Sequence, residues 1–529
     1  MNVFEDNPDK AGNNSTLDGD VKSVSNKDVF TSEYVIYDDN DFDRVYLSKS
    51  KIITDAIDKI GFGKYQIGLF FISGFGWFSD NAWPIAVGLI LSRLNEVDGV
   101  HAPTGKAPFI TLAQNLGLLA GAFFWSLSSD LIGRRWAFNI TLLTTGVFST
   151  ISGSSPNFAA LGVYAALWSF GVGGNMPVDT AVFLESIPSN KQYFLTILSV
   201  FWAFGQLVAN LFSWALISNF SCDDAEKVCY KSDNQGWRYF LYTLGGFTLL
   251  LFIIRFSIKN YESPKFLLAV GKDEKAVEVV HKIAKINGKP CFLTIESLRE
   301  VDDSESSSYV PPASNELLKD KIKKYNFSHI RECFASRKMA MSTIMVIVSW
   351  ALIGLAFPLY NAFLPTFLEK RGNANKPLSV RETYRNSLIV AVMGIPGSLI
   401  AGLLVELRIG RKGALCLSLL LTGVFLFCST TARTSNANLG WNCMFNLFST
   451  MMYGILYAYT PEIFPARIRG TAVGIASSAN RVLGVFAPVI GIYANLDTPV
   501  PIYVSGALFL VVGVISLFLP YESKGRKSL

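Results

Sequence analysis

The chain has 529 residues, of which 50% are hydrophobic and 17% charged, and its mean hydropathy is positive at +0.33. A soluble domain carries charge on roughly 25% of its residues, so this composition excludes an ordinary water-soluble globular protein and favours a chain that lies in a membrane. The formal net charge of +6 is spread over loops with no dense basic run among stacking aromatic residues, which argues against nucleic-acid binding.

The N-terminal segment is polar and acidic. Residues 1–45 contain eleven Asp or Glu and four Lys or Arg, and they lack the apolar stretch of a cleavable signal peptide. Segments of this composition cannot bury enough apolar surface to fold. We therefore expect residues 1–50 to form a disordered, acidic cytosolic tail.

Twelve apolar stretches follow, each of roughly the 20 residues that an α-helix needs to cross the hydrocarbon. They lie near residues 66–92, 107–128, 136–154, 158–183, 193–217, 237–257, 339–367, 386–406, 413–432, 439–460, 470–494 and 500–519. The sequence thus predicts an all-α membrane protein. Its expected domains are a six-helix bundle over residues 51–257, a cytosolic loop over 258–338, a second six-helix bundle over 339–519 and a cytosolic tail over 520–529.

Basic residues in short loops indicate the orientation, because cytoplasmic loops keep an excess of Lys and Arg. With the N-terminus inside, the loops that contain Arg134, Lys191 and Arg411 face the cytosol, whereas the basic outer loop of residues 368–385 argues the other way. We expect both termini in the cytosol, and residence in the plasma membrane rather than in a vacuole or vesicle.

This orientation places residues 218–236 outside, where an oxidising compartment permits disulfides and N-glycans. Cys222 and Cys229 lie in this loop and could be bridged or free, and Asn219 begins an Asn-Phe-Ser sequon. The glycan is the weaker prediction of the two, because Asn219 lies so close to the membrane. The seven Cys show no CxxC spacing, so no zinc or redox framework is predicted.

One charged motif occurs in both halves, in the short loop between the second and third helices. It reads Ser-x-x-x-Asp-Leu-Ile-Gly-Arg-Arg over residues 126–135 and Gly-x-x-x-Glu-Leu-Arg-Ile-Gly-Arg-Lys over residues 402–412. A second pair of motifs, around Glu185 and Glu462, follows the fourth helix of each half. A third pair, Tyr-Glu-Ser, ends the halves at residues 261–263 and 521–523.

These motifs resemble those of the major facilitator superfamily and of its sugar-porter branch, whose members carry related PESPR and PETKGR motifs. Residues 60–80 and 170–175 are most similar to the synaptic-vesicle-protein-related transporters, and a stretch like residues 173–179 is common in fungal chains. The resemblance implies twelve helices in two six-helix pseudo-repeats that rock to expose a central site to each side in turn. The paired glutamines of hexose carriers are missing from residues 349–368, which argues against glucose.

Acids and bases at the inner ends of neighbouring helices can pair when those ends meet and separate when they part. We therefore expect a cytosolic gate that closes when the site opens outward; ordinary positive-inside charge is the alternative. The expected gate residues are Asp130, Gly133, Arg134, Arg135, Glu185, Glu406, Gly410, Arg411, Glu462 and Arg469.

Three charged residues stand out inside apolar stretches: Asp80 in the first, Asp179 in the fourth and Arg481 in the eleventh. A charge at the centre of a membrane helix costs about 2.5–3.5 kcal/mol on insertion scales, so it usually faces a cavity or a partner. We expect Asp80 or Asp179 to accept a proton and Arg481 to be a counter-ion or a carboxylate anchor; helix packing is the alternative for each. Neutral candidates along the path are Trp83, Gln206, Asn361, Trp350 and Tyr457.

A monomeric, proton-coupled secondary transporter of a small organic solute is the leading prediction. A facilitative uniporter is the nearest alternative, and a transporter-like nutrient receptor is another. No Walker A motif occurs and the three His lie in loops, so we expect no enzyme activity, no metal and no cofactor. The expected partners are the solute, a proton and the lipid bilayer.

Overall fold

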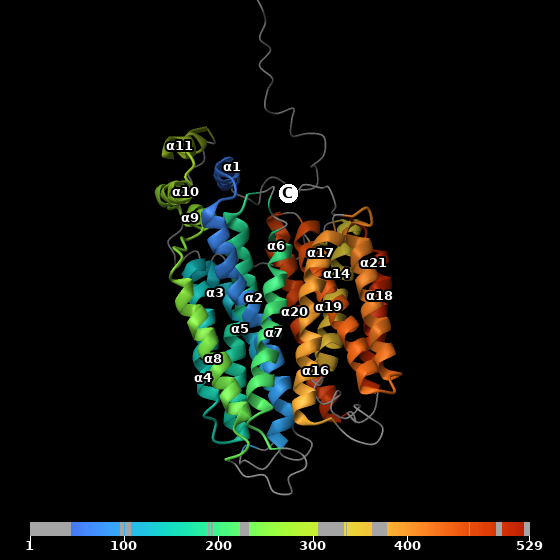
Figure 1. The fold of residues 1–529 in the computed structure, drawn as a ribbon. Helices are drawn as coiled ribbons and strands as arrows, with labels where there is room; N and C mark the ends of the chain where they lie inside the picture. Colours follow the sequence, from blue (N-terminus) through green and yellow to red (C-terminus); the bar gives the residue numbers. More distant parts are fainter. Residues whose placement is uncertain are drawn as a thin grey trace, which may run out of the picture.

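The computed structural model describes residues 44–95, 100, 107–188, 191, 194–222, 232–304, 333–334, 336–361, 378–405, 407–464, 466–493 and 500–522. Within these ranges every regular element is a helix, and the long helices stand side by side in two bundles (Figure 1). The all-α class predicted from the sequence is confirmed. Residues 1–43, most of the expected tail, lie outside the described residues.

The first bundle, here called the N-half, contains six long rods. They are α2 (Lys64–Leu91), α3 (Phe109–Ile132), α4 (Arg134–Ser152), α5 (Phe158–Ser186), α7 (Ser199–Phe212) with its π-helical continuation η3 (Ser213–Ile217), and α8 (Gly236–Arg255). Two short elements accompany them, η1 (Ser92–Asn95) after α2 and α6 (Phe194–Ile197) before α7.

The second bundle, the C-half, repeats this arrangement. Its rods are α14 (Arg337–Asn361), α16 (Val380–Val392) continued by α17 (Gly394–Leu404), α18 (Gly410–Thr430), α19 (Ser435–Ile463), α20 (Ala466–Tyr493) and α21 (Val500–Leu517). α14 packs on α20 as α2 packs on α7, and α18 packs on α19 and α21 as α4 packs on α5 and α8. The predicted pseudo-repeat is therefore present in the packing.

Seven of the rods in the described ranges are long and apolar enough to cross a membrane by length and composition alone. They are α7 with η3, α8, α14, α16 with α17, α18, α20 and α21. Five further rods are described: α2, α3, α4, α5 and α19. The described rods therefore number twelve, as the sequence predicted. α2, α5 and α19 are less apolar because they carry buried polar side chains such as Asp80, Asp179 and Asn446.

The halves meet along α3 and α20 on one side and along α7, α16 and α17 on the other. Pro488 in α20 has no N–H, so the carbonyl of Gly484 loses its helical hydrogen bond. Asn115 of α3 replaces that bond, since its Nδ2 donates to Gly484 O at 3.1 Å. Elsewhere on the interface, Tyr384 Oη of α16 donates to Leu89 O of α2 at 2.5 Å.

Four helices cap one end of the N-half (Figure 1), and we call that end of the molecule the cap end. They are α1 (Arg44–Ile60), α9 (Pro264–Ala269), α10 (Asp273–Asn287) and α11 (Ile295–Ser304). α1 begins inside the segment expected to be a disordered tail, because Ile53, Ile57 and Ile60 fall on one helix face and are buried.

A buried lysine fixes α1 to the other cap helices. Lys49 Nζ lies 2.6 Å from Asp273 Oδ2 of α10 and 2.7 Å from Asp302 Oδ2 of α11. Burial lowers the pKa of Lys49, but the hydrogen bonds and charges of the two aspartates outweigh burial and raise the pKa above its ordinary value. α10 is tied in turn to α2, where Tyr65 N donates to Asn287 Oδ1 at 3.0 Å.

Candidate functional site

An ion pair joins the two halves near the middle of their helices. Arg481 Nη2 of α20 donates to Asp80 Oδ1 of α2 at 2.9 Å. The second carboxylate oxygen, Oδ2, accepts a hydrogen bond from Trp202 Nε1 of α7 at 3.2 Å. The Asp80 side chain is 2% exposed and the Arg481 side chain 19%. The carboxylate is thus buried with both oxygens bonded, while part of the guanidinium stays accessible.

A proline distorts α2 beside this pair. Pro84 withholds the N–H that the carbonyl of Asp80 would accept in a regular helix. The carbonyl of Pro84 accepts from Gln114 Nε2 of α3 at 3.2 Å. α2 can therefore bend next to Asp80, where the two halves meet.

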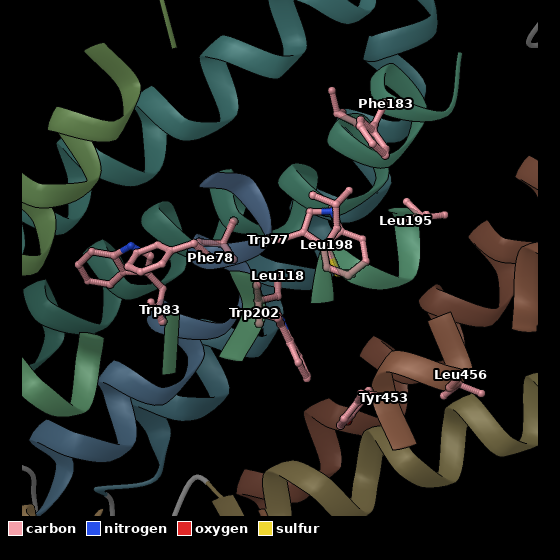
Figure 2. Close-up of a cluster of buried hydrophobic side chains, with 14 of the residues drawn as sticks. Trp77, Phe78, Trp83, Leu118, Phe183, Leu195, Leu198, Trp202, Tyr453 and Leu456 are labelled. Carbon is pink, nitrogen blue, oxygen red and sulfur yellow. The ribbon is translucent and has the colours of Figure 1, made fainter. Parts of the chain in front are cut away.

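Six aromatic rings from both halves contact one another in a network that includes Trp202, the hydrogen-bond partner of Asp80, and we call them the ring cluster. They are Trp77 of α2, Trp202 of α7, Trp350 and Phe357 of α14, and Tyr453 and Tyr457 of α19. The ring centroids of Trp202 and Tyr453 are 4.7 Å apart, as are those of Trp350 and Tyr457. Figure 2 shows Trp202 extending from the N-half toward Tyr453. These spacings are those of edge-to-face aromatic contacts.

One indole N–H of the ring cluster has no acceptor within the part of the chain that the structure describes. Trp77 is 2% exposed, and its Nε1 has no hydrogen-bond partner among the described residues. Trp350 Nε1, by contrast, donates to Thr460 Oγ1 at 2.8 Å. Leaving a buried donor without an acceptor is costly, so the Trp77 N–H is a group that a bound solute could satisfy.

The structure places Asp179 in the core of the N-half. Arg255 Nη2, from the end of α8, donates to Asp179 Oδ2 at 2.7 Å, and both side chains are fully buried. The guanidinium lies over the Phe138 ring of α4 at 3.8 Å, and Gly76 of α2 leaves the space that the carboxylate fills. These contacts all lie within the N-half, and the expected role of Asp179 as a proton acceptor stays a prediction.

The neutral candidates fall in different places. Trp83 is buried in the N-half, where its Nε1 donates to Thr248 Oγ1 at 3.2 Å. Gln206 lies between the halves, and its Nε2 donates to Asn446 Oδ1 at 3.3 Å. Asn361 is the last residue of α14, and its Nδ2 has no partner within the described ranges. A place for any of the three along the transport path stays a prediction.

At the cap end of the N-half, a carboxylate closes the first turn of α4. Glu262 accepts from Arg134 N at 2.9 Å and from Arg135 N at 3.3 Å. Gly133 has φ 103°, and a Cβ on it would lie 2.8 Å from Glu262 Oε2. The Arg134 guanidinium pairs with Glu185 of α5. We call this set the N-clamp.

The C-half repeats this set as the C-clamp. Glu522 accepts from Arg411 N at 2.9 Å and from Lys412 N at 3.1 Å, at the start of α18. Gly410 has φ 69°, and a Cβ on it would lie 2.7 Å from Glu522 Oε2. Arg411 Nη2 lies 2.7 Å from Glu462 Oε1 of α19. Each clamp ties together three segments of a single half.

The clamps add two residues that the expected gate lacks, Glu262 and Glu522. The repeated Tyr-Glu-Ser motif contains both of them and was the signal that could have identified them. The side chains of Asp130 and Arg469 lie outside the described part of the chain, and Glu406 is not among the described residues. Each clamp ion pair joins two helices of the same half.

The loop of residues 218–236, which was expected to lie outside, is described in part. Cys222 is disulfide-bonded, whereas Cys229 lies outside the described residues, so the pairing of these two stays a prediction. Asn219 Nδ2 donates to Ala215 O at 2.8 Å, and its glycosylation also stays a prediction. No group of His, Cys, Asp or Glu that could hold a metal ion occurs among the residues described.

Comparisons with known proteins agree with this architecture. The family model for sugar (and other) transporters matches residues 94–528. An uncharacterized MFS-type transporter of Schizosaccharomyces pombe is 63% identical, covering 93% of this chain and 91% of that protein. The MFS siderochrome iron transporter 1 of Ceriporiopsis subvermispora is 49% identical, covering 93% of this chain and 94% of that protein. The solved proton:xylose symporter XylE from E. coli aligns with a TM-score of 0.64 at 17% identity, covering 88% of this chain and 98% of XylE.

The two fungal relatives span nearly the whole chain and fit the fungal origin expected from residues 173–179. The match to XylE extends over both bundles and shows that the two proteins share a fold. Relatives and fold alike are those of integral membrane transporters of small solutes. The chain therefore belongs to the sugar (and other) transporter family of the major facilitator superfamily.

Proposed function

We propose that the protein is a proton-coupled secondary transporter that carries a small organic solute by alternating access. The observation that carries this proposal is the Asp80–Arg481 ion pair, which joins α2 of the N-half to α20 of the C-half. A contact between two bodies that rock against each other has to break and re-form in each cycle. A proton on Asp80 would release Arg481 and so link the movement to proton uptake.

The energetics support this coupling. Removing the partner of a buried charge costs about 3–5 kcal/mol, which lowers the population of the separated state by more than roughly a hundredfold. Protonation makes Asp80 neutral, so the positive charge of Arg481 loses its counter-ion. Water or an anionic solute can then pair with Arg481. The halves would therefore separate at this point in the protonated protein.

The two clamps would keep each half a single body during this movement. The Arg134–Glu185 and Arg411–Glu462 pairs, both inside one half, support such bracing. Asp130, Glu406 and Arg469 would then form the contact that opens and closes at the cap end. We further propose that the cap end faces the cytosol, with both termini there, and that the protein acts as a monomer in the plasma membrane.

The test is solute uptake into liposomes that contain the purified protein and a trapped pH-sensitive dye. Monocarboxylates, hexoses, organic cations and a ferric siderochrome are added one class at a time under an inward proton gradient. We expect one class to accumulate beyond its entry into protein-free liposomes, while the dye reports acidification in step with that extra uptake. Asp80→Asn should retain exchange of the solute but lose the acidification that accompanies it.

Glu278→Gln serves as the control, because it removes a carboxylate from the exposed surface of α10. Its uptake and acidification should match those of the unmodified protein. Solute movement without any proton movement in the unmodified protein would identify a uniporter and overturn the proposal. Solute binding without movement would identify a receptor instead.

A further inference from the structure

We infer that the solute is an aromatic carboxylate, whose ring lies in the ring cluster and whose carboxylate takes the place of Asp80 on Arg481. The inference rests on the proposed function for its site and adds the chemical class of the solute. Three features of the described residues carry it: the arrangement of the rings, the accessibility of the guanidinium, and the unpartnered N–H of Trp77.

The ring cluster is arranged to accept a flat ring between the halves. Trp202 of the N-half and Phe357 of the C-half lie within 25° of parallel, with centroids 6.2 Å apart. A third ring between them needs roughly 7 Å, twice a carbon–carbon contact distance of about 3.5 Å. A separation of the halves by about 1 Å would therefore admit a planar ring in contact with both faces.

The guanidinium next to these rings can receive a carboxylate. A guanidinium has five N–H donors in a planar fork that suits two carboxylate oxygens, and Arg481 donates to Asp80 through Nη2. Trp202 connects the two features, because its ring belongs to the cluster and its Nε1 bonds Asp80. When Asp80 takes up a proton, a solute carboxylate restores the negative charge beside Arg481, and the net charge of the site is unchanged.

Trp77 supplies a further donor. Its Nε1 is buried without an acceptor among the described residues, and its ring centroid lies 5.6 Å from that of Tyr457. A second oxygen on the solute, or a ring nitrogen, would satisfy this N–H. An aromatic carboxylate has both the flat apolar body and the acceptors that these groups need.

The other solute classes fit less well. A hexose needs several free polar side chains, but Gln206 Nε2 donates to Asn446 Oδ1, and Asn446 Nδ2 donates to Val390 O at 2.8 Å. An organic cation would have to displace Arg481 from Asp80 and leave that guanidinium without its anion, which is costly away from water.

The pH dependence of binding follows from the groups that face Asp80. These are Arg481 of α20, the hydroxyls of Tyr453 and Tyr457 of α19, and the Asp179–Arg255 pair of α5 and α8, while α7 contributes the neutral Trp202. Of these charged or titratable groups, Arg481 is the one that hydrogen-bonds Asp80 directly. Protonation of Asp80 frees Arg481, so the affinity of the protein for the solute carboxylate should rise as the pH falls.

The experiment is calorimetric titration of the purified full-length protein with benzoate at pH 7.5 and pH 5.5. Binding is measured rather than uptake, because benzoic acid crosses lipid unaided. Benzamide, with the same ring and no charge, and cyclohexanecarboxylate, with the charge and no aromatic ring, are the comparison ligands. We expect benzoate to bind at least tenfold more tightly than either, and more tightly at pH 5.5 than at pH 7.5.

Variants separate the contributions. Arg481→Lys should weaken benzoate binding at least tenfold, because lysine keeps the charge and loses the fork. Asp80→Asn should bind benzoate equally at both pH values. Trp168→Phe is the matched control: Trp168 is fully buried, its Nε1 also has no partner in the described ranges, and its ring packs on Trp83 away from the ion pair. Its affinity for benzoate should be unchanged.

Equal affinity of the unmodified protein for benzoate and both comparison ligands would overturn the inference. Proton-linked uptake of a hexose or an organic cation, with no benzoate binding, would also overturn it and leave the proposed function intact. Selective benzoate binding in a protein that moves no solute with protons would support the inference and refute the proposed function.

Discussion

The Asp179–Arg255 and Asp80–Arg481 pairs have different surroundings. Asp179 and Arg255 are fully buried inside one half, with Phe138 and Gly76 packed around them. Asp80 and Arg481 join different halves, and Arg481 is partly exposed. A pair inside a rigid body can stabilise it throughout the cycle, whereas a pair between two moving bodies has to separate.

Asp179→Asn should therefore lower the free energy of unfolding by about 3–5 kcal/mol, because it leaves Arg255 buried without a counter-ion. Replacing both residues, as Asp179→Leu with Arg255→Met, should recover much of this loss, because no charge stays buried. Thermal unfolding in detergent measures both effects, and Asp80→Asn should cost less than Asp179→Asn. Unchanged melting of the single Asp179 variant would show that the pair does not stabilise the N-half.

Gly133 is needed for its backbone conformation and for space. Its φ of 103° with ψ 145° is nearly restricted to glycine, and Glu262 lies where a Cβ would be. Gly133→Ala should cost roughly 1–3 kcal/mol in thermal unfolding. Gly162→Ala in α5 is the matched control, since nothing lies within 4 Å of the added Cβ, and it should be neutral or stabilising. Equal melting of the two variants would count against the N-clamp.

Which of these residues the sequence could predict depends on where they lie. Asp80 and Arg481 stand out because each interrupts an apolar stretch, and the structure brings them together. Arg255 ends an apolar stretch, where a basic residue looks like ordinary positive-inside charge, so its pairing with Asp179 was not predictable. Side-chain partners on other helices depend on helix rotation, which apolar length alone does not determine.

At the scale of elements, the start of the third helix in each half is built in the same way. A glycine with positive φ begins α4 and α18, and a carboxylate from the segment after the last helix of that half accepts their first free N–H groups. An anion is favourable there, because the N-terminal N–H groups of a helix lack partners and its dipole end is positive. The repeat in the sequence is thus a repeat of one local structure.

The cap helices give a prediction of their own. Lys49→Met should release α1, because it removes the cation shared by Asp273 and Asp302, and hydrogen exchange at pH 7 should speed up in α1 and α11. Lys59→Met, on the exposed face of α1, is the control and should leave exchange unchanged. Exchange in α1 that is equally slow in both variants would show that Lys49 does not hold it.

The same contact has a defined pH range. The folded-state pKa of Lys49 is raised, so the contact contributes fully below the unfolded-state pKa of about 10.4 and is lost as the pH rises through the folded-state value. A fluorescent label on α1 should therefore report a docked helix at pH 9 and progressive release above about pH 10.4. Release that begins near neutral pH would contradict this assignment.

The helices themselves were largely predictable, and their docking was not. Apolar stretches of membrane-crossing length predicted the twelve rods. α1 was missed because it is too polar to cross a membrane and depends on contacts distant in sequence: Lys49 and Asp273 are 224 residues apart. Nothing local in either segment encodes that contact.

At the scale of the whole molecule, the two halves touch toward both ends. Toward the cap end, Gly454 of α19 approaches Ser199 of α7. Toward the opposite end, Tyr384 of α16 bonds the carbonyl of Leu89 in α2. A rocking movement has to break one of these contacts whichever side opens.

A cross-link between the halves should therefore stop transport. A Cβ on Gly454 would lie 3.8 Å from Ser199 Cβ, a spacing that suits a disulfide, so Ser199→Cys with Gly454→Cys should form one on oxidation. Uptake should cease and return with reductant. Ala401→Cys with Gly454→Cys is the matched control, because its Cβ spacing of 3.5 Å lies within the C-half. Transport that persists in the oxidised Ser199–Gly454 variant would refute rocking about this contact.

The clamps also determine where the chain can be cut or extended. In each half the carboxylate that closes the third helix comes from the segment after the sixth, Glu262 in one and Glu522 in the other. A transporter expressed as two fragments should therefore be divided beyond α11, so that the first fragment keeps Glu262. A reporter protein fused to the C-terminus should follow Glu522, because a junction placed earlier would remove the group that holds the start of α18.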